Sequence, residues 1–178
     1  AQADLLAQKF FDNRDGYWPK LMSIDEVIDR AEANTSGKPV VLVDAADSPN
    51  GGAVGDSVAV AIRLLERGSK LRTGMFVKDP EVVQQAFAVG VGGSAEFELG
   101  AKFTPHIPGP LKAVGIVRSL HDGHVLREGP VGKGSPFFVG KAAVISFGNL
   151  YIMVCEAPSV PGDPQLFRHF GIEPTLCD

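Results

Sequence analysis

The sequence predicts an α/β protein with two unlike halves, and two patterns indicate this class. In the first hundred residues short apolar runs alternate with helical segments, an order that favours parallel strands joined by right-handed crossovers. After Gly100 the chain changes to paired β-branched runs separated by short turns, which is typical of antiparallel hairpins. We therefore expect one domain over residues 1–178, with an α/β half at 1–100 and an antiparallel β half carrying a terminal helix at 101–178.

Composition and charge exclude several classes of protein. The chain has 178 residues, of which 44% are hydrophobic and 21% charged, as in an ordinary globular domain. A net charge of −4 disfavours a nucleic-acid or anionic-membrane binder, and no apolar run reaches the roughly 18 residues of a membrane span. Cys155 and Cys177 are too few for a disulfide framework, which favours free thiols and a cytoplasmic location. Because the chain begins without a methionine and stops at Asp178, right after a helix, we expect a piece of a longer protein.

Two helices are predicted before the first strand. Residues 4–12 place Leu5, Leu6 and Phe10 at helical spacing. A second helix over 24–33 begins with a capping box, in which the Ser23 hydroxyl and the Glu26 carboxylate each satisfy a backbone donor.

The remaining elements follow from apolar runs and turn residues. Val40, Val41, Leu42 and Val43 form a continuous β-branched and apolar run, which predicts a central parallel strand buried on both faces. Asp-Pro pairs at 79–80 and 163–164 predict helix starts, because Asp caps and Pro suits the first helical position. Asp-Gly at 122–123 and Gly-Asn at 148–149 predict two hairpins. The predicted elements are helix 58–67, strand 72–77, helix 80–89, strand 95–99, strands 111–120 and 125–128, strands 142–147 and 150–156, and a last helix that ends at Gly171.

The most polar stretch is the loop 44–56, which follows the predicted strand 40–43. Ligands of α/β proteins bind at the carboxyl ends of such strands. Three carboxylates would repel phosphate and the loop lacks the ending of a P-loop, so it better suits a metal, a cationic or amide group, or a polar substrate. Asp44, Asp47 and Asn50 are the candidates, and the alternative is that Asp44 and Asp47 only form Asx turns. We expect Asp56 to be a helix cap.

The histidines do not form a recognisable metal site. His106 is a candidate because it lies in the Pro-rich loop 102–110 after a predicted strand. His121 and His124 at a predicted hairpin tip, and His169 on the last helix, are given no role. The sequence contains no His-x-x-x-His or Cys-x-x-Cys pair and no Gly-x-Ser-x-Gly elbow. We therefore assign no catalytic residue and no metal ligand within this chain.

The loop 44–56 resembles the Asp-x-Ala-Asp-Asn-Pro-Gly-Gly-Gly-x-x-Gly-Asp signature of the microcystinase C (MlrC) family, whose members are candidate metallopeptidases much longer than this chain. The resemblance continues through Asp79-Pro80-Glu81, residues 90–102 and residues 163–174, so it covers nearly the whole chain. Ser48 stands where the family usually has Asn, and Asn50 stands where it usually has the first Gly.

This resemblance implies the C-terminal domain of a metal-dependent amide or peptide hydrolase. The metal ligands would lie mostly in an N-terminal domain of the same protein, with zinc in that longer protein and none expected in this fragment, which alone should be inactive. The candidates for substrate binding, or for supporting the residues that hold the metal, are Asp44, Asp47, Asn50, Gly51, Gly52 and His106. The expected partners are the N-terminal domain and a peptide or amide substrate, and self-association stays open. The alternatives are a non-catalytic oligomerisation domain and a small-molecule-binding α/β domain.

Overall fold

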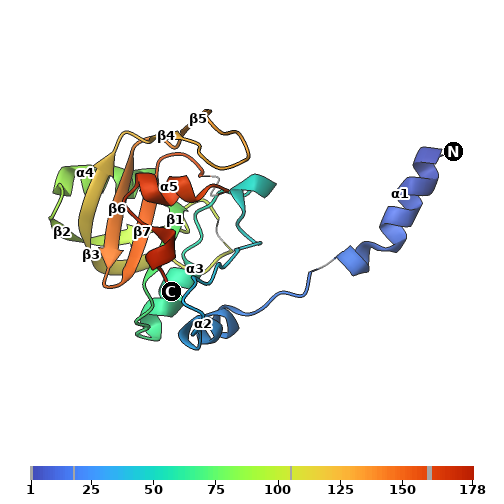
Figure 1. Ribbon diagram of the computed structural model, residues 1–178, viewed down its shortest axis with the longest axis horizontal. Helices are drawn as coiled ribbons and strands as arrows, with labels where there is room; N and C mark the ends of the chain where they lie inside the picture. The colour runs from blue at the N-terminus through green and yellow to red at the C-terminus, as the bar shows by residue number, and fades with distance from the viewer. Residues whose placement is uncertain (1, 18, 105, 160–161) are drawn as a thin grey trace.

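The computed structural model describes residues 2–17, 19–104, 106–159 and 162–178 (Figure 1). Helices alternate with strands in the first half, and strands dominate the second. The helices are α1 (Gln2–Asp12), α2 (Ile24–Glu32), α3 (Ala59–Glu66), α4 (Pro80–Val89) and α5 (Pro164–His169), with 3-10 turns η1 (Arg14–Tyr17), η2 (Pro49–Gly51) and η3 (Pro174–Leu176). The strands are β1 (Thr73–Lys78), β2 (Ser94–Leu99), β3 (Leu111–His121), β4 (His124–Leu126), β5 (Pro136–Phe138), β6 (Ala142–Phe147) and β7 (Leu150–Cys155).

The main sheet is mixed, which confirms the α/β class. Its strand order is β1-β7-β6-β3-β2, and a separate small sheet pairs β4 with β5. Strand β1 runs parallel to β7, whereas β7–β6, β6–β3 and β3–β2 are antiparallel. The predicted parallel β-α-β-α-β arrangement of the first half is therefore wrong. Strands β1 and β2 stand at opposite edges of the sheet, because strands from the second half of the chain lie between them.

The predicted central strand 40–43 is also wrong. These residues adopt no regular secondary structure, and Val41 and Val43 are 81% and 78% exposed. A β-branched run predicts burial only when a sheet is available to cover it. Here β1 already forms that edge of the sheet, and the segment instead runs beside the C-terminal residue, with the Val40 N–H donating to the carbonyl of Asp178 at 3.3 Å.

Of the two predicted hairpins, one is confirmed. Gly148-Asn149 joins β6 to β7, with Phe147 opposite Leu150. Asp122-Gly123 joins β3 to β4, but β4 pairs with β5, so that hairpin is wrong. At this end β3 pairs with β6 instead, up to His121 opposite Ala142. The chain entering β6 passes so close to the turn that a Cβ on Gly123 would collide with the Gly140 carbonyl.

The core lies on both faces of the sheet. Strand β6 is buried along its whole length: Ala143, Ile145 and Phe147 face the cluster that includes α3 and α4, while Ala142 and Val144 face the cluster that includes α5. This alternation follows from the two-residue period of a strand. Figure 1 shows the sheet between these helices. Burial on both faces explains why β6 is apolar at all of its residues except Ser146, whose hydroxyl accepts a hydrogen bond from Arg118.

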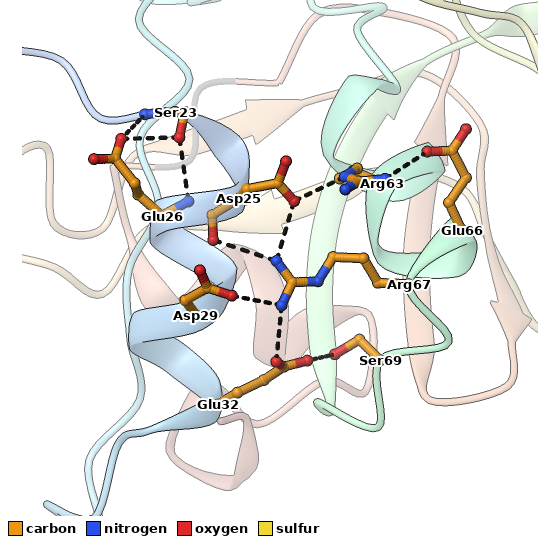
Figure 2. Close-up of polar contacts among 9 residues, drawn as sticks. All are labelled: Ser23, Asp25, Glu26, Asp29, Glu32, Arg63, Glu66, Arg67 and Ser69. Atoms are coloured by element: carbon orange, nitrogen blue, oxygen red, sulfur yellow. Dashed lines mark hydrogen bonds and ion pairs between the residues drawn. The ribbon is translucent and has the colours of Figure 1, made fainter.

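Helix α2 is attached to α3 by an ion-pair network (Figure 2). The predicted capping box is present at its start, with Ser23 and Glu26 bonded reciprocally. The guanidinium of Arg67, at the end of α3, contacts three carboxylates of α2: Asp25 at 3.0 Å, Asp29 at 2.5 Å and Glu32 at 3.1 Å. The hydrogen bonds that Arg67 donates to Asp29 and then to Asp25 are the largest causes that raise its pKa. Because Ile28 is also buried in the core, α2 is held against the domain, and residues 34–44 continue from its C-terminal end.

Helix α1 confirms the predicted first helix, yet all its described residues are exposed. Figure 1 shows it lying apart from the sheet. Within the described residues, no helix has both the length and the apolar content that crossing a membrane requires.

Candidate functional site

Asp47 organises the polar loop that leads to α3. Its carboxylate is 9% exposed; Oδ1 accepts the Gly55 N–H at 2.8 Å and Oδ2 accepts the Ser57 N–H at 2.6 Å. The Asp47 N–H in turn donates to Asp44 Oδ1 at 3.3 Å, and the Ala46 N–H donates to the same oxygen at 3.0 Å. Asp44 thus forms the Asx turn, and Asp47 uses both of its oxygens to hold the loop's own backbone.

The tip of this loop is presented to solvent. Asn50, Gly51 and Gly52 are exposed, and η2 is closed by bonds from the Gly51 N–H to the Ser48 carbonyl at 2.9 Å and from the Gly52 N–H to the Pro49 carbonyl at 3.0 Å. Gly52 has a φ of 92°, in the left-handed region that favours glycine. The tip is therefore a hydrogen-bonded turn on which Asn50 is an exposed polar residue.

Asp56 is not a helix cap. Helix α3 begins at Ala59, after Val58. The Asp56 side chain is fully buried, where Oδ2 accepts the Phe103 N–H at 2.7 Å and Oδ1 accepts the Thr104 hydroxyl at 2.6 Å. Its main-chain carbonyl accepts the Ala101 N–H at 2.8 Å. Instead of capping the helix, this carboxylate lies against the chain that follows β2, where the Phe103 N–H and the Thr104 hydroxyl donate to it.

Asp79 is the predicted cap of α4 and also a second clamp. Its fully buried carboxylate accepts the Val82 N–H at 3.1 Å, the Gly100 N–H at 2.9 Å and the ammonium of Lys102 at 3.0 Å. Burial works to lower the pKa of Lys102, but the hydrogen bonds to Glu81 and Asp79 outweigh it and raise that pKa. The ends of the two edge strands, β1 and β2, are thereby joined.

These two clamps were not found by sequence reasoning. The loops meet so closely that a Cβ on Gly100, whose φ is 71°, would collide with the Val58 side chain and the Asp56 carbonyl. The Gly55 carbonyl accepts the Lys78 N–H at 2.7 Å, which fastens the loop 44–58 to the end of β1. The only sequence signals for these clamps were an Asp beside an apolar run and a Gly directly after a strand. This pattern is too common in proteins to identify such a contact.

The structure does not gather all the predicted residues into one site. His106 is exposed in a turn, and the contacts from its loop to the loop 44–58 run through Phe103 and Thr104. Asp44, Asp47, Asn50, Gly51 and Gly52 share one loop, in which the acidic side chains face inward to the backbone and the tip faces outward.

The described residues do not fit a metal site by themselves. Among them, no three or more His, Cys, Asp or Glu side chains are grouped as a metal ion would need. The two best-placed carboxylates, Asp47 and Asp56, already accept short hydrogen bonds from N–H and O–H donors.

A hollow of about 430 Å³ lies on the α5 side of the sheet. Arg118, His121 and His169 are among its lining residues. His121 is half-buried, and its Nε2 lies 2.8 Å from the Ser119 hydroxyl. Burial, followed by the neighbouring His169, lowers the pKa of His121.

Comparison with known proteins places this domain in a family. The model of the MlrC C-terminus matches residues 42–178. The chain belongs to the MlrC C-terminus family. This confirms the resemblance found in the loop 44–56. Microcystinase C from Sphingomonas sp. is 32% identical over 147 residues, a match that covers 83% of this chain and 28% of microcystinase C.

A solved structure shares the fold. The crystal structure of a candidate metallopeptidase from Mesorhizobium sp. BNC1 is similar with a TM-score of 0.84 and 26% identity, covering 96% of this chain and 34% of that one. This MlrC C-terminus domain therefore spans about a third or less of the length of these relatives.

Proposed function

We propose that this chain is the C-terminal domain of a metal-dependent peptide or amide hydrolase, where it helps to bind substrate and to close the active site. The family match carries this proposal: the domain belongs with microcystinase C and with a candidate metallopeptidase. Because the described residues supply no metal cluster, the metal ligands would lie mainly in an N-terminal part of the longer protein. Zinc is the metal we expect there, and the free thiols of Cys155 and Cys177 suit a cytoplasmic enzyme.

The exposed and the inward-facing residues of the loop would have different roles. Asn50, Gly51 and Gly52 form the exposed tip and would touch the substrate or the opposing domain. Asp44 and Asp47 would act as positioning residues, since their oxygens hold backbone N–H groups that fix the tip. His106, exposed on the adjoining loop, would contact the same partner.

The experiment is a hydrolysis assay on the full-length protein loaded with zinc. Cleavage of linear and cyclic peptides is followed by mass spectrometry, with a chelator-treated sample as the blank. We expect metal-dependent cleavage, and we expect Asn50→Ala to lower kcat/KM by about tenfold, the size of one lost hydrogen bond, with an unchanged melting temperature.

The control is Asn149→Ala, the same substitution in the turn between β6 and β7; it removes the hydrogen bond from the Asn149 side chain to the Lys70 carbonyl, so it can lower the melting temperature but should leave kcat/KM unchanged. Lack of any amide cleavage by the metal-loaded protein would overturn the proposal and leave the oligomerisation or small-molecule-binding alternative. If Asn50→Ala and Asn149→Ala behave alike, the hydrolase assignment stands but the tip has no role in it.

A further inference from the structure

The segment 40–43 has the apolar, β-branched composition of a buried strand, but nothing in the described domain covers its outer side. Val41 and Val43 are 81% and 78% exposed, whereas Val40 and Leu42 are half-buried. No turn or bend interrupts residues 39–44. Exposure that alternates every second residue is the pattern of an extended strand with one side against its own domain. The segment is therefore already shaped like a strand, with two valines facing outward.

Its backbone is available for pairing. The Val40 N–H donates to the Asp178 carbonyl, but no hydrogen bond joins the N–H groups of Val41, Leu42 or Val43 to any other residue that the structure describes. An extended segment with free N–H groups and exposed β-branched side chains is a template for strand addition at the edge of a sheet.

The relatives are much longer than this domain, so such a sheet can come from outside the shared fold. The shared fold covers 96% of this chain but only 34% of the Mesorhizobium protein, so about two thirds of that protein is available to cover surfaces of this domain. Helix α1 needs a cover as well: Leu6 and Phe10, four residues apart and so on one helical face, are 67% and 68% exposed. Along the chain, α1 precedes and the segment 40–43 follows α2, which is itself fixed to the domain by Arg67.

We propose that in the longer protein residues 40–43 become a β-strand at the edge of a sheet in its N-terminal part, and that the apolar face of α1 packs on that same part. This rests on the proposed function in placing the chain within a longer protein. It deepens that function, because a strand ending at residue 43 carries Asp44 and the tip at Asn50 to the junction between the two parts. The pairing of residues 40–43 would then fix where the tip lies relative to the active site.

Hydrogen–deuterium exchange tests the strand directly. The amides of residues 41–43 are compared between the 178-residue chain and the full-length protein, with the amides of β6 as the internal reference. We expect exchange at 41–43 to be slower by on the order of 100-fold in the full-length protein, while β6 is equally protected in both. Equal rates at 41–43 in the two proteins would overturn the inference. Protection already present in the 178-residue chain, together with a dimer by sedimentation, would assign the segment to a second copy and overturn it too.

A matched pair of variants gives a second test. Val43→Asp and Val131→Asp both introduce a charge at an exposed valine, Val131 being 77% exposed in the connection between β4 and β5. Neither should change the melting temperature of the 178-residue chain. In the full-length protein Val43→Asp should lower the melting temperature and restore fast exchange at 41–43, whereas Val131→Asp should not. If Val43→Asp is as harmless there as Val131→Asp, the strand does not form. Neither readout uses hydrolysis, so the two proposals can be told apart. A full-length protein that is inactive but protected at 41–43 would contradict only the proposed function. One that is active but unprotected at 41–43 would contradict only this inference.

Discussion

Replacing Asp56 by alanine removes the clamp that joins the loop before α3 to the chain after β2. Two hydrogen bonds to a buried carboxylate are lost, from the Phe103 N–H at 2.7 Å and the Thr104 hydroxyl at 2.6 Å. Hydrogen bonds to charged groups contribute about 1.5–3 kcal/mol each, so we expect a loss of about 3–6 kcal/mol in the free energy of unfolding. A helix cap would cost only about 0.5–2 kcal/mol. Because a whole domain is stable by about 5–15 kcal/mol, Asp56→Ala should leave a marginal fold.

The assay is urea and thermal unfolding followed by circular dichroism. At about 2–4 °C per kcal/mol for a domain of this size, the melting temperature should fall by at least about 6 °C. Thr104→Val removes one of the two donors and should cost less. The double variant Asp56→Ala/Thr104→Val should be little worse than Asp56→Ala alone, since both changes break the same contact. A loss below about 2 kcal/mol for Asp56→Ala, or full additivity of the pair, would refute the clamp.

Three further predictions concern other parts of the domain. Arg67→Met keeps much of the side-chain stem but removes the guanidinium between α2 and α3, so the melting temperature should drop, and by less in 1 M salt, where ion pairs are screened. Burial and His169 hold the pKa of His121 below 6.5 in the folded state, so the unfolded state binds the proton more tightly. The free energy of unfolding should therefore fall as the pH drops below 6.5 and level off below the folded-state pKa. In His121→Gln this fall should be smaller. Burial raises the pKa of the Cys155 thiol to about 12, so a disulfide reagent at pH 8 should modify it only after urea unfolding, while Cys177, which is half-buried, reacts sooner.

Local chemistry made part of this fold predictable from sequence. The Asp79-Pro80 and Asp163-Pro164 pairs start helices as expected, and both carboxylates accept hydrogen bonds from the first turn. The Ser23 capping box and the turn at Gly148-Asn149 are likewise decided by a few adjacent residues. Signals of this kind are complete within one turn of the chain, so tertiary packing has little room to override them.

Strand pairing and carboxylate partners were not predictable in the same way. Strand β1 pairs with β7 rather than with β2, a choice that depends on residues far along the chain. Asp56 stands where a cap is expected, but its donors come from Phe103 and Thr104. The apolar run 40–43 predicted a buried strand, yet Val41 and Val43 are exposed, because the β-branched composition of a run does not say whether a sheet is present to cover it. The roles of Asp44, Asp47, Asn50 and His106 stay predictions.

The parallel pairing of β1 with β7 has a consequence for biosynthesis. Residues 73–78 leave the ribosome long before residues 150–155, so β1 exposes an open row of N–H and C=O groups while the rest of the domain is made. The β6–β7 hairpin closes locally and quickly, and β1 can dock only onto its outer edge. The nascent chain thus carries β1 as an unpaired edge until residues 150–155 have emerged, and any truncation before β7 leaves that edge open to aggregation.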